Sequence, residues 1–238
     1  MIFTVGFEGV NRTGKGTQIG LLRTKLELQS IPTLVLRGNG SREAQGSHKG
    51  DPLSAWWDKA NDLRDEMFDA GWWVRASVRL AREYLAWREY IFPRFLERTG
   101  NTDGIILVDR TVLSAFMLLL ENGDTDWRKL YPPHAGPRGT EISGELVCPD
   151  LIFNFIAPAA ALLPRLAPDD PKHDFRKGLI ERNAGKYAIA SALVPPDVRR
   201  RIHELDASLT EEVLHESIVA TLGCYAPKRI GDALHANP

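Results

Sequence analysis

Residues 8–18 read EGVNRTGKGTQ, and two glycines and a lysine in this stretch decide how the chain is expected to fold. Gly9 and Gly14 are separated by four residues, and Lys15 follows the second glycine directly. This spacing nearly matches the pattern G-x-x-x-x-G-K-[ST], in which backbone N–H groups at a helix start surround a phosphate and the lysine adds positive charge. Gly16 stands where the pattern has a hydroxyl residue, and Thr17 supplies a hydroxyl one position later.

The segments on either side of this loop give it the context that a phosphate-binding loop requires. Residues 2–7, IFTVGF, are an apolar run of strand length. Residues 17–30 place Ile19, Leu22 and Leu26 on one helical face. A glycine-rich turn without chemistry is the alternative reading, but a loop that follows a buried strand and opens a helix favours phosphate binding.

The remaining chain continues the alternation of strands and helices. Further strands are expected at 31–38, 104–110, 150–158 and 200–208, and helices at about 52–98 with a break near 70–73, then at 111–123, 159–166, 179–194 and 209–224. This order predicts an α/β fold over 1–238, a five-stranded parallel sheet covered by helices on both faces. Functional residues are then expected at the carboxyl ends of the strands. Residues 124–148 are expected to be a loop-rich insertion and 167–178 a polar loop.

Composition narrows the class of protein. The chain has 238 residues, of which 43% are hydrophobic, and a net charge of −1. Bulk electrostatic binding to nucleic acid or to an anionic membrane is therefore not predicted, although a local basic cleft would be compatible with these values. Cys148 and Cys224 have no metal-ligand spacing, which favours free thiols in a reducing compartment. The apolar N-terminus has no signal-peptide or membrane-span pattern, so a cytoplasmic protein is expected.

The loop resembles that of thymidylate kinases, in which F-E-G-x-D-R-x-G-K-[ST]-T-Q recurs, and its GKGTQ ending resembles adenylate kinases. Further segments resemble the thymidylate kinase family in the same order along the chain: 34–42, 107–116, 148–166, 178–190 and 202–213. The resemblance implies a P-loop kinase fold with a short lid at 167–178, ATP and Mg²⁺ as cofactors, and a homodimer.

The resemblance also implies roles on the ATP side. Lys15 would grip the transferred phosphates, Arg12 would stabilise the charge that develops during transfer, and Asp109 with Thr17 would hold Mg²⁺. The other candidate ATP-binding residues are Gly9, Asn11, Thr13, Gly14, Gly16, Gln18 and Arg176. The lid residues Lys172, Arg176 and Lys177 are either clamps on ATP or a solvated charged loop, and the sequence leaves both open.

On the acceptor side, Arg37 or Arg42 would hold a phosphate together with Arg110. Arg82 and Ser114 complete the candidate acceptor-binding residues. Glu8 would orient the acceptor or act as a base for an acceptor hydroxyl. Two positions depart from the family, because Asn11 replaces an aspartate that contacts the acceptor sugar and Thr111 replaces a tyrosine.

Residues 38–75 form an acceptor-side insertion that departs most from the family. They hold four of the six tryptophans: Trp56, Trp57, Trp72 and Trp73. These side chains are either a stacking platform for a base or anchors in a helical cover, and the second is favoured because adjacent helical residues cannot face one ligand.

Three functions follow in order of preference. The first is ATP-dependent phosphoryl transfer to a nucleoside monophosphate, with dTMP or another deoxypyrimidine monophosphate as the expected acceptor. The second is a kinase acting on a hydroxyl of a nucleoside, a modified base in nucleic acid or another small metabolite. The third is a nucleotide-binding protein that has lost catalysis, against which the retained Lys15, Arg12, Asp109 and Arg110 argue.

Overall fold

The computed structural model describes residues 1–37, 88, 92–121, 123, 125–126 and 148–236, and within them five strands form one parallel sheet. The spatial order is β2-β3-β1-β4-β5. The bounds are β1 Ile2–Gly9, β2 Thr33–Arg37, β3 Gly104–Asp109, β4 Leu151–Ile156 and β5 Ile202–Asp206. The expected α/β fold with a five-stranded parallel sheet is confirmed.

The apolar runs that predicted strands are explained by burial on both faces of the sheet. The central strand β1 is buried over all but its first residue, and its neighbours β3 and β4 are buried over all but their last. Strands of this kind are continuous apolar runs because both faces are covered. The register aligns Phe7 with Asp109 on one side and with Phe153 on the other, so the carboxyl ends of these strands reach the same edge.

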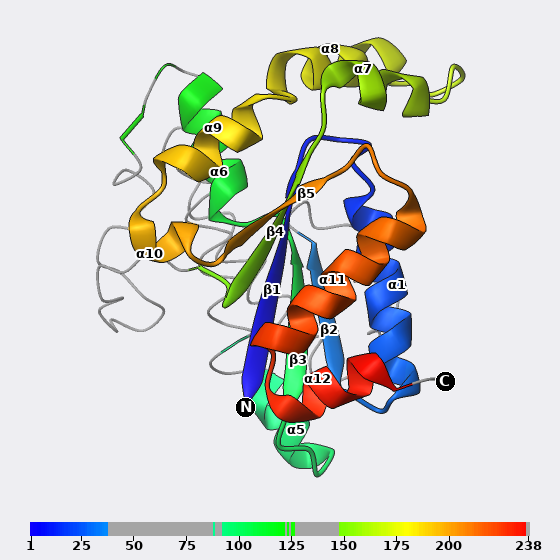
Figure 1. The fold of residues 1–238 in the computed structure, drawn as a ribbon, viewed down its shortest axis with the longest axis vertical. Helices are drawn as coiled ribbons and strands as arrows, with labels where there is room; N and C mark the ends of the chain where they lie inside the picture. The colour runs from blue at the N-terminus through cyan, green and yellow to red at the C-terminus, as the bar shows by residue number, and fades with distance from the viewer. Residues whose placement is uncertain (38–87, 89–91, 122, 124, 127–147, 237–238) are drawn as a thin grey trace, which may run out of the picture.

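Helices cover both faces, as Figure 1 shows. One face carries α1, α11 and α12, and the other carries α6 and α9. The helices are α1 Lys15–Leu28, α5 Phe92–Arg98, α6 Val112–Glu121, α7 Ala159–Leu162, α8 His173–Asn183, α9 Lys186–Leu193, α10 Pro196–Arg199, α11 Glu211–Tyr225 and α12 Lys228–His235, and a short 3₁₀ turn, η4 Leu163–Arg165, follows α7. The α7–α8 segment lies beyond the carboxyl ends of the strands, opposite the N-terminus (Figure 1).

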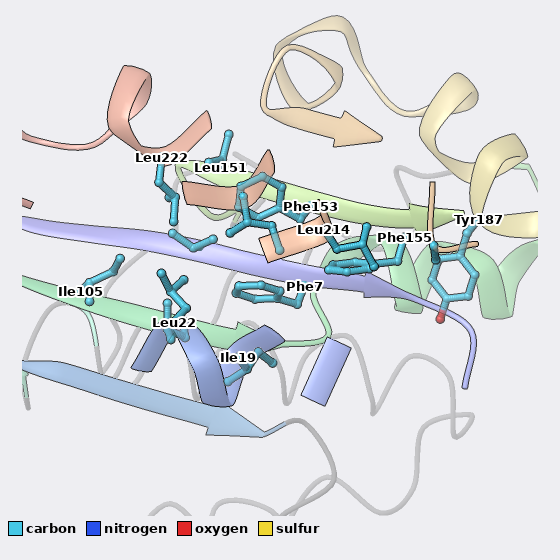
Figure 2. Close-up of a cluster of buried hydrophobic side chains, with 14 of the residues drawn as sticks. Phe7, Ile19, Leu22, Ile105, Leu151, Phe153, Phe155, Tyr187, Leu214 and Leu222 are labelled. Atoms are coloured by element: carbon cyan, nitrogen blue, oxygen red, sulfur yellow. The ribbon is translucent and has the colours of Figure 1, made fainter. Parts of the chain in front are cut away.

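Two main hydrophobic clusters hold the layers together. In the larger cluster, Phe7 and Phe153 from the sheet pack with Leu22 of α1 and Leu214 of α11 (Figure 2). The smaller cluster includes Leu113 and Phe116 of α6, Ile152 of β4 and Ala190 of α9. Burial of such side chains contributes roughly 1.5–3 kcal/mol each, so both faces of the sheet stabilise the fold.

Several helix predictions need correction. The segment 167–178 was expected to be a loop, but it is helical from His173 onward. The prediction failed because most of the helix surface is solvated, so its polar residues resemble those of a loop. The segment 179–194 was expected to be one helix, but α8 and α9 are separated at Ala184 and Gly185. Glycine is a poor residue for a helix interior, and the break lets Ala190 pack with α6. The helices α10 and α12 were not expected.

Other predictions lie outside the described residues. These are the insertion 38–75 with its tryptophans, nearly all of 124–148, and the part of the expected helix 52–98 that precedes Phe92, apart from Arg88. None of the helices in the described part of the chain is long and apolar enough to cross a membrane.

Candidate phosphate-binding site

The loop between β1 and α1 has a backbone that only particular residues tolerate. Gly9, Arg12 and Gly14 all have positive φ, at 134°, 68° and 88°. At Gly9 a Cβ would lie 2.6 Å from the backbone oxygen of Phe155 on β4, so a larger residue would collide with the neighbouring strand. Arg12 is not a glycine, and a left-handed conformation at such a residue marks a position where local strain is retained. The loop is therefore held tightly between the sheet and α1.

Lys15 folds back over the loop. Its Nζ donates to the backbone oxygens of Gly9 at 2.7 Å and Val10 at 2.9 Å, and it lies 3.3 Å from Thr13 Oγ1. The pKa of Lys15 is lowered to about 7, chiefly by burial and then by the nearby Arg110 cation. An anion placed beside this ammonium would relieve both effects, so the site is electrostatically suited to bind one.

Glu8 lies beneath the loop and holds the turn between β3 and α6. One carboxylate oxygen accepts from the backbone N–H groups of Thr111 and Ser114, and the other accepts from the Ser114 hydroxyl. The side chain has no exposed surface. Burial raises the pKa of Glu8, and the Arg110 cation and these hydrogen bonds oppose the rise. In this arrangement the carboxylate faces the protein and not the solvent.

Arg110 joins the turn to the loop. Its guanidinium donates to the backbone oxygen of Gly9 at 3.2 Å, to Asn11 Oδ1 at 3.1 Å and to the hydroxyl of Tyr187 at 2.7 Å. Ser114 lies within 3.3 Å of the same guanidinium. Arg110 itself has a positive φ of 79°. These contacts fix the guanidinium beside the loop between β1 and α1.

Asp109 and Thr17 were predicted to hold Mg²⁺, and the structure offers one observation that fits a cation. Asp109 Oδ1 is buried and has no hydrogen-bond partner within the described residues. A buried carboxylate oxygen without a donor is costly unless a cation or water satisfies it. Thr17 is exposed on the first turn of α1, so its side chain is not packed in the core. The oxygen chemistry of these two residues suits Mg²⁺.

A second group of charges lies at the mouth of the loop. Arg12 donates to Asp170 Oδ2 at 2.9 Å, and Arg176 of α8 forms an ion pair with the same oxygen. Arg165 of η4 donates to the backbone oxygen of Arg12 at 3.4 Å. Two arginines from separate parts of the chain therefore share one carboxylate, and a third binds the backbone beside it.

Among the other predicted residues, Gln18 is placed differently from the ATP contacts. Its Nε2 donates to the backbone oxygen of Glu211 at 2.8 Å, and its Oε1 lies 3.1 Å from His215 Nδ1. Gln18 therefore ties α1 to α11. Arg37 ends β2 in register with Asp109, at the same sheet edge as the loop. Arg42 and Arg82 lie outside the described residues.

Three residues of this network were not among the predicted site residues. Tyr187 bonds Arg110, Asp170 bonds two arginines, and Arg165 reaches the loop backbone. Asp170 is 158 positions from Arg12 and Tyr187 is 77 positions from Arg110, so local spacing gives no signal for either pair. The sequence signal for the three residues was regional: Arg165 and Tyr187 lie in the family-like segments 148–166 and 178–190, and Asp170 lies in the polar stretch 167–178.

Comparison with solved structures finds a crystal structure of thymidylate kinase from Ehrlichia chaffeensis. The two chains are 17% identical, and the match covers 93% of this chain and 98% of that one, with a TM-score of 0.45. No model of a protein family and no curated protein sequence matches this chain.

Proposed function

We propose that this chain is an ATP-dependent kinase that transfers a phosphoryl group to a nucleoside monophosphate, with a deoxypyrimidine monophosphate such as dTMP as the expected acceptor. The observation that carries the proposal is the glycine-bounded loop, with the Lys15 ammonium bound inside it and Arg110 fixed beside it at the carboxyl edge of the sheet. A cluster of fixed cations around backbone N–H groups is what phosphoryl transfer requires of a protein.

The chain's own residues would perform the reaction mainly by positioning. Lys15 would exchange its loop carbonyl partners for phosphate oxygens of ATP, and Arg12 would neutralise charge on the group being transferred. Arg110 would orient the acceptor phosphate, because a guanidinium donates in a fixed planar fork. The bond from the terminal phosphorus to the bridging oxygen of ATP breaks as the acceptor oxygen bonds to that phosphorus, leaving ADP.

Mg²⁺ would be held by Asp109, directly or through water, with Thr17 nearby. When bound, the ion would neutralise phosphate charge during transfer. The orphaned Oδ1 of Asp109 supports this assignment.

A monophosphate acceptor is favoured over a hydroxyl acceptor by the environment of Glu8. A hydroxyl needs a base within hydrogen-bond reach, whereas a phosphate acceptor already carries a nucleophilic oxygen. Both carboxylate oxygens of Glu8 are used by Thr111 and Ser114, and the side chain is fully buried. We therefore assign Glu8 a positioning role for the Arg110 turn. Asn11 contributes to the same arrangement, because its Oδ1 accepts from Arg110.

The test is a transfer assay with labelled ATP and a panel of nucleoside monophosphates, nucleosides and oligonucleotides, with and without magnesium. Magnesium-dependent transfer to a monophosphate is expected. Transfer only to a hydroxyl or a polymer would replace the proposed acceptor class, and tight ATP binding without transfer to any acceptor would favour an inactive nucleotide-binding protein.

A site control accompanies the assay. Lys15→Ala is expected to abolish transfer while the circular dichroism spectrum stays unchanged. Activity that survives this substitution would show that the phosphate-binding loop is not the catalytic site.

A further inference from the structure

Asp170 occupies an unusual place in the charge distribution around the loop. A single carboxylate oxygen, Oδ2, is shared by Arg12 from the phosphate-binding loop and Arg176 from α8. Its other oxygen, Oδ1, accepts from the backbone N–H of Lys172 at 2.9 Å. These contacts hold the pKa of Asp170 below its ordinary value, with the Lys172 hydrogen bond as the largest cause and the two arginines adding to it. The carboxylate is therefore a fixed anion at the mouth of the loop.

The two arginines that meet at Asp170 come from different elements. Arg12 lies between β1 and α1, whereas Arg176 lies on α8, and two guanidiniums cannot bond each other because both are donors only. The carboxylate is the group that brings the two guanidiniums together. Arg165 adds a third cation within reach of the Arg12 backbone. One carboxylate paired with two guanidiniums, with a third bound to the adjacent Arg12 backbone, leaves an excess of positive charge, which favours a ligand with several negative charges.

The pairing is also easy to exchange. The Arg12 and Arg176 side chains retain 35% and 37% of their surface exposed, whereas the Asp170 side chain between them retains 6%. Solvent screens the two exposed guanidiniums, so each ion pair holds its arginine less firmly than a fully buried pair would. A phosphate chain offers more charge and more acceptor oxygens than one carboxylate, so it can take over both guanidiniums without disturbing the core.

We propose that Asp170 is a positioning residue that stands in for a phosphate anion, pairing Arg12 with Arg176 until a polyphosphate displaces it. The inference rests on the proposed function, because the Asp170 carboxylate would compete with the phosphates of ATP for the same two arginines. In the free protein, Asp170 keeps the two arginines together and lowers the affinity for polyphosphate. On binding, the phosphate oxygens replace the carboxylate, and the Asp170 side chain turns to solvent.

The test measures binding, so it does not depend on turnover. Isothermal titration gives the Kd of inorganic tripolyphosphate and of a non-hydrolysable ATP analogue for the wild type and for Asp170→Asn. The substitution keeps the side-chain size and removes the charge. We expect the Kd to fall about three- to tenfold, because the carboxylate no longer competes with the ligand for the two partly exposed guanidiniums.

Matched variants separate this effect from a general loss of negative charge. Asp169→Asn removes the charge of the neighbouring exposed residue and is expected to change the Kd less than about twofold. Asp170→Glu keeps the charge and is expected to stay near the wild type. In an Arg12→Gln, Arg176→Gln background, Asp170→Asn should change the Kd no more than Asp169→Asn does, because the carboxylate then has no partner to release.

Each outcome decides between roles. Weaker binding by Asp170→Asn, or an effect equal to that of Asp169→Asn, would overturn the inference. The proposed function would still stand if the wild type bound ATP. A lower kcat with an unchanged Kd would show that Asp170 instead holds the arginines for catalysis, and would also overturn it. Absence of tripolyphosphate and ATP binding by every variant would overturn both the inference and the proposed function.

Discussion

Gly9 and Gly14 lie at the two ends of the loop between β1 and α1, and both have positive φ, yet their surroundings differ. A Cβ at Gly9 would meet the backbone of β4 at 2.6 Å, whereas a Cβ at Gly14 would meet nothing within 4 Å. Gly14→Ala is therefore expected to cost only the left-handed backbone, about 1 kcal/mol. Gly9→Ala adds a collision with a strand that cannot move aside, so its cost is expected to be about 3 kcal/mol or more.

Urea unfolding of the two variants beside the wild type measures this difference. The two glycines serve as controls for each other, since both substitutions add one methyl group at positive φ. Equal losses in the free energy of unfolding would show that the contact with Phe155 does not set the Gly9 requirement.

The lowered pKa of Lys15 is expected to make ligand binding at the loop depend on pH. Its pKa in the free protein is about 7, below the ordinary value of 10.5. A bound polyphosphate favours the charged ammonium and raises this pKa. At a pH between the pKa of the free protein and the raised pKa of the complex, binding therefore takes up a proton. The affinity for tripolyphosphate is therefore expected to fall as pH rises above about 7, by up to about tenfold per pH unit.

Calorimetric titration at pH 8.5, in two buffers with different ionisation enthalpies, reports the proton uptake directly. Lys15→Arg is the control, because a guanidinium stays charged and should take up no proton. Binding by the wild type without proton uptake would mean that Lys15 is already charged in the free loop.

At the scale of elements, Gln18 joins α1 to α11 through both atoms of its side-chain amide. Gln18→Met keeps the length of the side chain and removes both hydrogen bonds. The free energy of unfolding is expected to fall by about 1–2 kcal/mol, since the partners on α11 lose a donor and an acceptor. The Kd of tripolyphosphate is expected to stay unchanged, and a weakened Kd with unaltered stability would support the original expectation that Gln18 contacts ATP.

The packing of β1 against the β3–α6 turn gives a second prediction at this scale. A Cβ at Gly6 would lie 2.4 Å from Thr111 Cγ2 and 3.3 Å from Ile152 Cγ1. Gly6→Ala is expected to destabilise the chain by about 1–3 kcal/mol through overpacking. Thr111→Ser removes the obstructing methyl group and keeps the hydroxyl, so the double variant should recover part of the loss.

Urea unfolding of the two single variants and the double variant completes a thermodynamic cycle for this contact. Additive losses would show that Thr111 is not the residue that excludes a side chain at Gly6.

The elements that could be predicted from the sequence are those whose signal is local. The apolar runs of β1, β3 and β4 identify strands because both faces are buried, and the glycine spacing identifies the loop because its backbone needs those residues. The start of α8 could not be predicted, because its polar residues resemble those of a loop. The contact of Asp170 with Arg12 could not be predicted either, because it joins positions 158 apart and depends on where the segment between η4 and α8 lies in the fold.

At the scale of the whole molecule, the parallel sheet explains why residues scattered along the chain meet. The central position of β1, between β3 and β4, places its carboxyl end beside the ends of both neighbours. The loop after β1 therefore lies next to Arg110 after β3, and the chain after β4 brings Asp170 to Arg12. A near-neutral chain thus concentrates positive charge at one edge of the sheet.

This arrangement predicts that a ligand at the loop stabilises the whole chain. The loop, the Arg110 turn and the arginines of η4 and α8 come together only in the folded protein, so polyphosphate binds the folded state in preference to the unfolded one. At a free tripolyphosphate concentration one hundred times its Kd, the free energy of unfolding is expected to rise by about 2.7 kcal/mol. Urea unfolding with and without the ligand, monitored by tryptophan fluorescence and by circular dichroism, measures the rise. Lys15→Ala is expected to lose most of it, whereas an equal rise in both proteins would place the binding site away from the loop.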